Sequence, residues 1–73
     1  GEPATDEGRY AIAVLGKAFD LVDAVAAANG ATMSELSAAA GLNRSTAVRI
    51  LANLSARGYV ERDRDGRYHL GVR

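Results

Sequence analysis

The stretch that decides the fold is residues 41–60, GLNRSTAVRILANLSARGYV, in which a turn, a helix and the start of an extended segment follow one another. Asn43 is a good N-terminal cap for a helix that runs to about Arg57 and ends at Gly58. The apolar residues of this helix have the i, i+3, i+4, i+7 spacing that places one stripe against a core. They are Ala47, Ile50, Leu51 and Leu54.

The opposite face of this helix carries hydroxyl, guanidinium and small apolar groups near its N-terminus. In the major groove of DNA, an arginine can donate two hydrogen bonds to guanine, and an apolar group can contact the methyl group of thymine. The face is therefore interpreted as a DNA recognition surface. Its members are Ser45, Val48, Arg49 and Ala52.

A shorter helix is predicted just before the turn. Thr32 and Glu35 have the spacing of a capping box, in which each side chain accepts a hydrogen bond from the backbone amide of the other residue. This helix stops at Gly41, and Leu42 then inserts into the core. Two helices joined by a turn of about three residues form a helix-turn-helix. The inward residues of the shorter helix are predicted to be Met33, Leu36, Ser37 and Ala40.

The first helix is predicted to run from about Tyr10 to Ala28, with a left-handed stop at residues 29–30, Asn-Gly. Two apolar residues near its start, Ile12 and Val14, either dock on a second chain or are covered by the tail of the same chain. The core stripe of this helix is predicted to be Leu15, Ala18, Phe19, Val22, Val25 and Ala26.

Residues 59–62 and 67–70 alternate in the manner of strands, and Asp65-Gly66 between them predicts a hairpin turn. Because a lone hairpin is marginally stable, one face must pack on the helices, and the candidates are Val60, Tyr68 and Leu70. The hairpin tip then offers Arg64 and Arg67 to a phosphate or to an adjacent minor groove. The predicted fold is mainly α: a small α+β domain, a winged helix-turn-helix with three helices and a two-stranded β-hairpin wing.

The length of 73 residues allows one small domain, which we place at residues 10–73. Residues 1–9 are polar and do not begin with Met, so we expect a disordered leader that starts with a cloning remnant. No apolar stretch approaches the length of a membrane span, so no membrane partner is expected.

Enzyme chemistry is not expected. The chain has no cysteine and a single histidine, His69. It therefore cannot form a metal site from thiolates or from a cluster of histidines. The acidic residues scatter over solvent faces, and Asp63 and Asp65 are expected to shape the hairpin turn rather than to form an acid–base pair. We therefore predict no catalytic residue, no metal and no cofactor.

The formal net charge of zero conceals an asymmetry between the two halves of the chain. Residues 1–43 hold two basic and six acidic residues, whereas residues 44–73 hold seven basic and three acidic residues. A basic face can bind phosphates even when the rest of the chain is acidic. Arginines can also be solvated surface charges with no binding role. Their position on the exposed helix face and the hairpin instead favours a role in DNA binding.

In their order and spacing, these motifs closely resemble the N-terminal winged helix-turn-helix domain of IclR-type bacterial transcription regulators. The resemblance implies a cytoplasmic domain that binds a double-stranded DNA operator as a homodimer or higher homo-oligomer. It also implies a larger following domain, outside these 73 residues, that senses a small-molecule effector. The matching segments are TMSEL at 32–36, GL at 41–42, RST at 44–46, RIL at 49–51, RGYV at 57–60 and DGRY at 65–68.

The resemblance further implies contacts residue by residue. The pattern Arg44-Ser45-Thr46 with Arg49 matches the DNA-contacting helix tip of the family, and Arg49 is the first candidate for a base contact. Arg44 and Thr46 either read a base or fix the register on a phosphate, and Thr46 can instead bond to local backbone. Val48, where the family often has a polar residue, suggests an apolar contact with thymine.

The remaining expected contacts go to phosphates. Ser34 resembles a family position that touches the DNA backbone, and Lys17 matches a basic position of the first helix, although a solvated surface charge is the alternative for Lys17. Asn43 stands where the family often has proline, and it keeps helix initiation because Asn caps. The wing contributes Arg64 and Arg67.

A second function class stays open, because the winged-helix fold can also present its third helix or its wing to another protein. Exposed acidic or aromatic groups on the third helix would favour such a protein–protein interaction module. The helix tip instead carries Arg44 and Arg49, which favours DNA.

Overall fold

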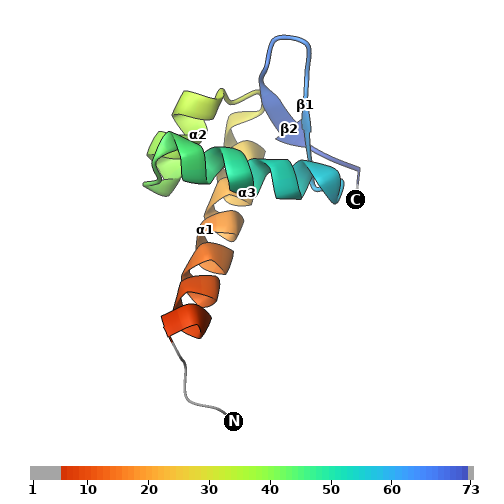
Figure 1. Cartoon of the computed structure of the whole chain (residues 1–73). Helices are drawn as coiled ribbons and strands as arrows, with labels where there is room; N and C mark the ends of the chain where they lie inside the picture. The colour runs from red at the N-terminus through yellow and green to blue at the C-terminus, as the bar shows by residue number, and fades with distance from the viewer. Residues whose placement is uncertain (1–5, 73) are drawn as a thin grey trace.

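The computed structural model describes residues 6–72, which form three helices followed by a two-stranded antiparallel hairpin (Figure 1). The mainly α fold with a hairpin wing is the predicted class, which is thereby confirmed. In Figure 1, α3 crosses in front of α1, and the N-terminal half of α1 projects away from the body. The elements are α1 Asp6–Ala28, α2 Met33–Ala40, α3 Arg44–Ala56, β1 Val60–Arg62 and β2 Tyr68–Leu70.

The start of α1 differs from the prediction. The helix begins at Asp6, before the predicted start at Tyr10, so residues 6–9, which we assigned to the leader, are helical. The rest of the predicted leader, residues 1–5, lies outside the described part of the chain. At the other end the predicted stop is confirmed, because both residues after the helix have positive φ angles, 43° at Asn29 and 103° at Gly30.

The predicted caps of α2 and α3 are present. The Thr32 hydroxyl accepts from the Glu35 amide at 3.2 Å, and the Glu35 carboxylate accepts from the Thr32 amide at 2.8 Å. Gly41 ends α2 in the left-handed conformation, with φ 66°. Two residues later the Asn43 side chain accepts from the Thr46 amide and begins α3. The turn geometry that separates α2 from α3 is therefore fixed by local hydrogen bonds.

The core lies where all three helices and the hairpin meet. The inward residues predicted for α3, Ala47, Ile50 and Leu51, are buried, and Leu54 packs against them partly buried. Burial is also confirmed for the largest apolar residue of α2, Leu36. Around these lie the other buried or half-buried residues that the sequence predicted, which are Met33, Ser37, Ala40, Leu42, Val60 and Tyr68.

The predicted core stripe of α1 is right for Val25, which is buried, and for Ala18 and Val22, which are half-buried, but it is wrong for its other three members. Leu15 and Phe19 are 55% and 61% exposed, and Ala26 is also exposed. The reason is that α1 is apolar over a wide arc, while the body of the domain covers only one side of it. The residues that pack inward, fully or partly buried, are Val14, Ala18, Leu21 and Val25.

The hairpin is tied to the rest of the fold by the loop between α1 and α2. The Tyr68 amide donates to the Ala31 carbonyl at 2.8 Å, and the Gly30 amide donates back to the Tyr68 carbonyl at 3.1 Å. Leu70, predicted to press on the helices, is 49% exposed, because it ends a strand of a two-stranded sheet that has no further neighbour to cover it. The wing is thus held against the loop between α1 and α2 by the backbone of Tyr68.

Candidate nucleic-acid interface

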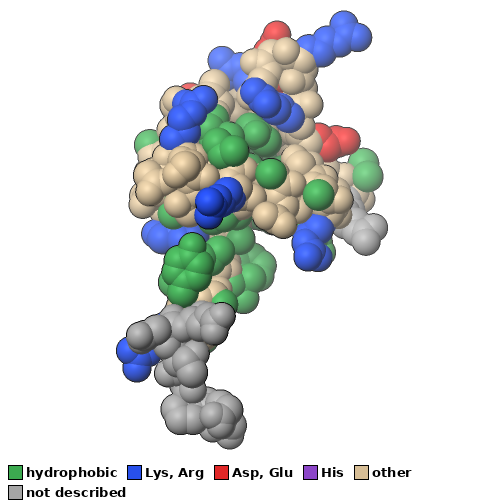
Figure 2. Space-filling view, in the orientation of Figure 1, with side chains coloured by type: hydrophobic (Ala, Val, Ile, Leu, Met, Phe, Trp, Pro, Cys, Tyr) green, Lys and Arg blue, Asp and Glu red, His purple; other side chains and the backbone are tan. Residues whose placement is uncertain are grey.

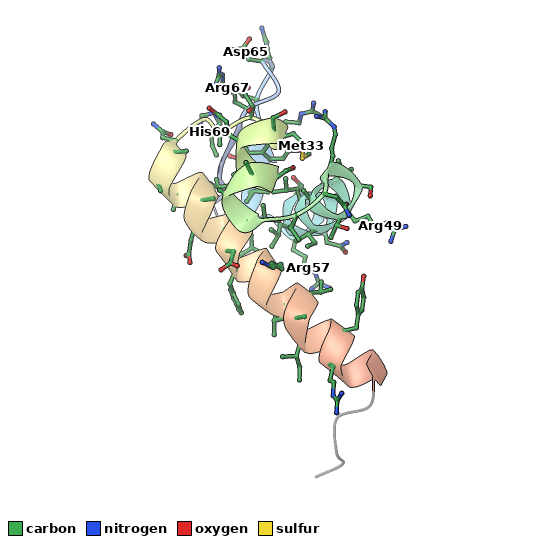
Figure 3. The ribbon with its side chains drawn as sticks, turned by 90° about the vertical axis from the view of Figure 1, so that its left-hand side faces the viewer. Met33, Arg49, Arg57, Asp65, Arg67 and His69 are labelled. Carbon is green, nitrogen blue, oxygen red and sulfur yellow. The ribbon has the colours of Figure 1, made fainter. Side chains whose placement is uncertain are left out.

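The outer face of α3 is exposed along its length, as its apolar spacing predicted. Ser45, Val48 and Ala52 lie on this face, and Val48 is 43% exposed. The Arg49 side chain points away from the body of the domain (Figure 3). This face therefore presents the mixture of donor and apolar groups that major-groove contacts require.

The N-terminus of α3 is organised by Asn43. Its side-chain oxygen accepts hydrogen bonds from the Thr46 amide at 2.9 Å and from the Ser45 hydroxyl at 3.0 Å. The cap thus engages the main-chain amide of Thr46, and Thr46 itself is half-buried. The dipole of the helix adds a partial positive charge at this end, which favours a nearby phosphate.

Four arginines of α3, its C-terminal cap and the hairpin turn are exposed, and their side chains make no hydrogen bond or ion pair with the side chains or backbone of residues 8–72. Two of them, Arg44 and Arg49, lie on the first turns of α3, while Arg57 follows its last turn and Arg64 lies in the hairpin turn. Figure 2 shows separate Lys and Arg side chains distributed over the face that carries α3 and the wing. Their charges are free to meet phosphates.

Lys17 and Arg67, both predicted to contact DNA, make hydrogen bonds to distant backbone carbonyls within the protein. Lys17 Nζ donates to the Ala40 carbonyl at 2.9 Å, so it closes the C-terminal end of α2. Arg67 Nη1 donates to the Gly30 carbonyl at 2.7 Å and lies 4.0 Å from a Glu35 oxygen. Ser34 is exposed on the first turn of α2.

The hairpin turn is built on Asp63, as expected. One of its carboxylate oxygens accepts from the amides of Asp65 and Arg67, at 2.9 and 3.0 Å, and the other lies 2.7 Å from His69 Nε2. The hydrogen bond from His69 and those from the backbone hold the pKa of Asp63 below its ordinary value. The wing tip that presents Arg64 is therefore a fixed loop.

Sequence reasoning missed two basic residues of this surface. The Arg62 guanidinium lies 5.9 Å from the centre of the Tyr68 ring, within the range of a cation–π contact, so it extends the basic edge of the wing. Arg57, beyond the last turn of α3, is the other. Strand alternation gave a weak signal for Arg62, whose position opposite Tyr68 in the register was not available from sequence alone.

Among the described side chains, those of residues 8–72, no three His, Cys, Asp or Glu come together in a way that would hold a metal ion. Within the same residues, no helix has the length and apolar character needed to cross a membrane.

A helix-turn-helix with an exposed, arginine-bearing third helix and a hairpin wing defines the winged helix-turn-helix class. The model of the IclR helix-turn-helix domain matches residues 14–64, so the chain belongs to the IclR helix-turn-helix family. It is accordingly a DNA-binding domain of the kind used in transcription regulation, and the family is one of regulators rather than enzymes. A comparison with curated proteins gave no match.

The same fold is found in solved structures of two kinds of protein, a regulator homolog and an enzyme. An IclR homolog from Microbacterium hydrocarbonoxydans, complexed with 4-hydroxybenzoate, is 27% identical with a TM-score of 0.72 over 81% of this chain and 25% of that one. An O-methyltransferase of neocarzinostatin biosynthesis, NcsB1, in complex with S-adenosyl-L-homocysteine, is 34% identical with a TM-score of 0.64 over 84% of this chain and 20% of that one. The chain thus spans a quarter or less of these proteins.

Proposed function

We propose that this domain binds double-stranded DNA sequence-specifically, with α3 in the major groove and the wing on the backbone or in the adjacent minor groove. The observation that carries the proposal is the division of α3 into two faces. Its inner stripe is fully committed to the core, whereas its outer face leaves Arg44 and Arg49 exposed and without partners among the described residues. Charged groups that the fold does not use are available to DNA.

Each predicted contact then has its own role. Arg49 is assigned to a base edge, and Val48 to a thymine methyl group, because both project from the middle of the outer face. Arg44 and Ser45 lie in the first turn, where a phosphate or a base is in reach. Arg64 reaches a phosphate or the minor groove from the wing tip.

Three other predicted contact residues affect DNA binding indirectly, by positioning α2, α3 and the wing. Asn43 sets the start of α3, so its effect on DNA binding passes through the Ser45 and Thr46 contacts. Lys17 and Arg67 hold α2 and the wing in place through backbone carbonyls, so that α3 and the hairpin keep their relative orientation. Ser34, exposed at the start of α2, is assigned to the DNA backbone.

The proposed full-length assembly is larger than this chain. The IclR homolog is described as complexed with 4-hydroxybenzoate, and the domain spans 25% of that protein. We assign a small-molecule effector to a further domain of a cytoplasmic bacterial regulator, which acts as a homodimer on two half-sites about 34 Å apart.

A second candidate is a winged-helix protein-interaction module. It is favoured by the match to an O-methyltransferase, an enzyme in which the same fold makes up 20% of the chain. In that case the arginines of α3 would be solvated surface charges, and DNA binding would show no sequence preference.

Selection from a pool of randomised duplexes separates the two candidates. The purified chain is incubated with the pool at moderate salt, and the bound fraction is recovered and sequenced over several rounds. Enrichment of one motif is expected from base-edge contacts. Recovery that stays uniform for the chain, and also for a chain dimerised artificially, contradicts sequence-specific binding.

A further inference from the structure

His69 joins the hairpin wing to the loop between α1 and α2. Its Nε2 atom lies 2.7 Å from a carboxylate oxygen of Asp63 in the hairpin turn, and its Nδ1 atom lies 3.3 Å from the side-chain oxygen of Asn29, directly after α1. The ring packs on Gly30, where an added Cβ atom would lie 3.4 Å from Cε1 of His69. Figure 3 shows His69 at the base of the wing. We call Asn29, Asp63 and His69 the wing clamp.

Both neighbours of the ring are hydrogen-bond acceptors in this arrangement. A carboxylate and the oxygen of an amide only accept, and a neutral imidazole has a single N–H to donate. The two ring nitrogens of His69 therefore both donate only when the ring is protonated. A neutral ring gives up one of the two contacts, unless the Asn29 amide turns over and presents its NH2 group to Nδ1. The geometry thus fits an imidazolium.

The charged groups around His69 come from the hairpin and from α2. The Asp63 carboxylate keeps its charge at neutral pH, because hydrogen bonds from His69 and from the backbone hold its pKa below the ordinary value of 3.8. Glu61 lies opposite His69 in the strand register, so its side chain is on the same face of the hairpin. The Arg67 guanidinium is turned to a backbone carbonyl of the loop, at 2.7 Å, and to Glu35 of α2, at 4.0 Å. A protonated His69 therefore has carboxylates beside it, while Arg67 already has acceptors of its own.

The wing clamp lies between the loop and the turn that presents Arg64. Tyr68, the residue before His69, exchanges two backbone hydrogen bonds with the loop, at 2.8 and 3.1 Å. The Asp63 oxygen that His69 does not use accepts from two amides of the hairpin turn. Loss of one ring contact therefore leaves the wing attached through Tyr68, but it holds the turn less firmly against the loop.

We propose that His69 is a positioning residue of the DNA interface, and that the proton on its ring sets how firmly the wing is held. At about pH 6 the imidazolium bonds to both Asp63 and Asn29, whereas at about pH 8 the neutral ring keeps one of these contacts. The wing is thereby the pH-sensitive part of the interface, and acid strengthens its contact with DNA. The clamp follows from contacts within the protein, and only its effect on DNA affinity rests on the proposed function.

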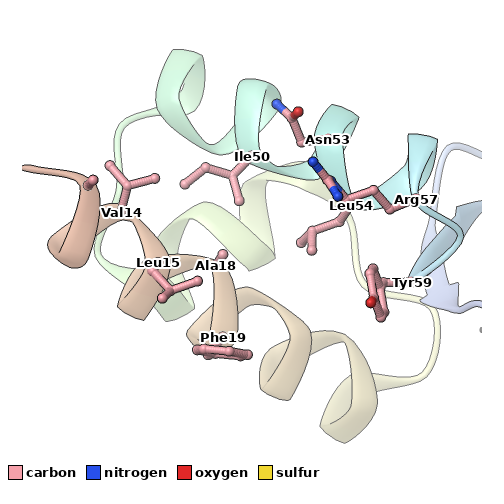
Figure 4. Close-up of a pocket in the computed structure, with 10 residues that line it drawn as sticks. Val14, Leu15, Ala18, Phe19, Ile50, Asn53, Leu54, Arg57 and Tyr59 are labelled. Carbon is pink, nitrogen blue, oxygen red and sulfur yellow. The ribbon is translucent and has the colours of Figure 1, made fainter.

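The composition of the chain makes such an effect traceable to one ring. Histidine is the side chain that ordinarily changes charge between pH 5 and 8, and the chain has one histidine and no cysteine. The groove between α1 and α3 in Figure 4 is lined by apolar residues together with Asn53, Arg57 and Tyr59, whose side-chain types ordinarily keep their charge over this range. The terminal amino group also titrates there, but it is the same in every variant.

Amide hydrogen exchange of the 73-residue chain without DNA tests the clamp. Protection factors, corrected for the intrinsic pH dependence of exchange, are compared at pH 6 and pH 8 for the amides of Gly30 and Tyr68, which join the loop to the wing. We expect about two- to tenfold more protection at pH 6, the worth of one hydrogen bond. The Leu42 amide, bonded to a carbonyl of α2, is the internal control and should not change.

Three variants show whether the ring acts through its two partners. His69→Gln should remove the pH dependence of protection. Asp63→Asn keeps an oxygen for the amides of the turn but not the charge, and Asn29→Gly keeps the left-handed backbone but not the side chain, so each should reduce it. Equal protection of the parent at both pH values, as a turned-over Asn29 amide would give, overturns the proposal. An equal change at Leu42 does so too, because the ring would then act on the whole fold.

Affinity for the selected duplex, measured at pH 6 and pH 8, extends the test to DNA. We expect the parent to bind about two- to tenfold more tightly at pH 6, and His69→Gln to bind equally at both. Full pH dependence in Asn29→Gly would show that His69 meets a phosphate directly, which overturns a positioning role. Protection that depends on pH in a chain that binds no DNA contradicts the proposed function alone. DNA binding without pH-dependent protection contradicts the clamp alone.

Discussion

The ammonium group of Lys17 donates a hydrogen bond to the main-chain carbonyl of Ala40 at 2.9 Å, and thereby joins the middle of α1 to the C-terminal end of α2. The contact is partly buried, and it places a positive charge where the dipole of α2 is negative. It joins α1 to the last residue of α2, just before the turn that leads to α3.

Lys17→Met is therefore expected to destabilise the fold by about 1.5 to 3 kcal/mol, because it leaves a carbonyl without its charged donor. Chemical denaturation measures the change. Arg64→Met, which removes an exposed arginine without a protein partner, should change stability by less than about 0.5 kcal/mol. Equal stability of the two variants would refute a positioning role for Lys17.

The capping box predicts an acid-dependent loss of stability. The hydrogen bonds from the Thr32 amide and hydroxyl lower the pKa of Glu35 below its ordinary value of 4.5. A carboxylate whose pKa is depressed by folding contributes stability that is complete above its ordinary pKa and is lost as the pH falls through the folded value. The melting temperature should thus fall with acid from the region of pH 4.5 downward.

Glu35→Gln isolates this effect. The amide oxygen of glutamine can still accept from the Thr32 amide, but it does not titrate. We expect a melting temperature close to that of the parent at neutral pH and a smaller drop below the ordinary pKa of Glu35. If the variant loses stability in acid over the same pH range as the parent, Glu35 is not the group responsible. Asp63, whose pKa is also lowered, is then the next candidate.

Leu51→Ala tests the packing of α3. Leu51 is fully buried, so the truncation should cost about 2 to 5 kcal/mol of unfolding free energy. Leu70→Ala removes the same atoms from a half-exposed site and should cost much less. If denaturant titrations gave the same free energy of unfolding for the two variants, the arrangement of the core would be contradicted.

Gly16→Ala should stabilise the fold. Because alanine is the better helix former and meets open space, the free energy of unfolding of the dilute chain should rise by up to about 1 kcal/mol. Chemical denaturation measures the change. A Gly16→Ala chain that is less stable than the parent would contradict the open space around Gly16.

The elements of this fold are predictable from sequence where a local rule fixes them. Asn43, the Thr32–Glu35 pair and Gly41 each carry a cap whose partners lie within four residues, and all three caps are present. The α3 stripe was predictable for a similar reason, because only one face of that helix is strongly apolar.

The features that the sequence did not predict depend on which surfaces of the helices and the hairpin pack together. On α1 both the Leu21 side and the Phe19 side are apolar, so spacing alone does not reveal which side the body covers. The partners of Lys17 and Arg67 lie 23 and 37 residues away, and no local pattern encodes such contacts. Basic residues that read as DNA contacts in the sequence are therefore partly used to build the domain.

The central claim is that the outer face of α3 reads bases, and fluorescence anisotropy of the Arg49→Ala chain tests it most directly. Binding to the selected duplex and to a scrambled duplex is compared for the parent, for Arg49→Ala and for Arg57→Ala, an arginine beyond the far end of α3. The account predicts that Arg49→Ala loses about 1 to 3 kcal/mol on the selected duplex alone, while Arg57→Ala loses a smaller and equal amount on both. If the parent binds both duplexes equally, or Arg49→Ala loses the same affinity on each, the claim of base-specific recognition through Arg49 is contradicted.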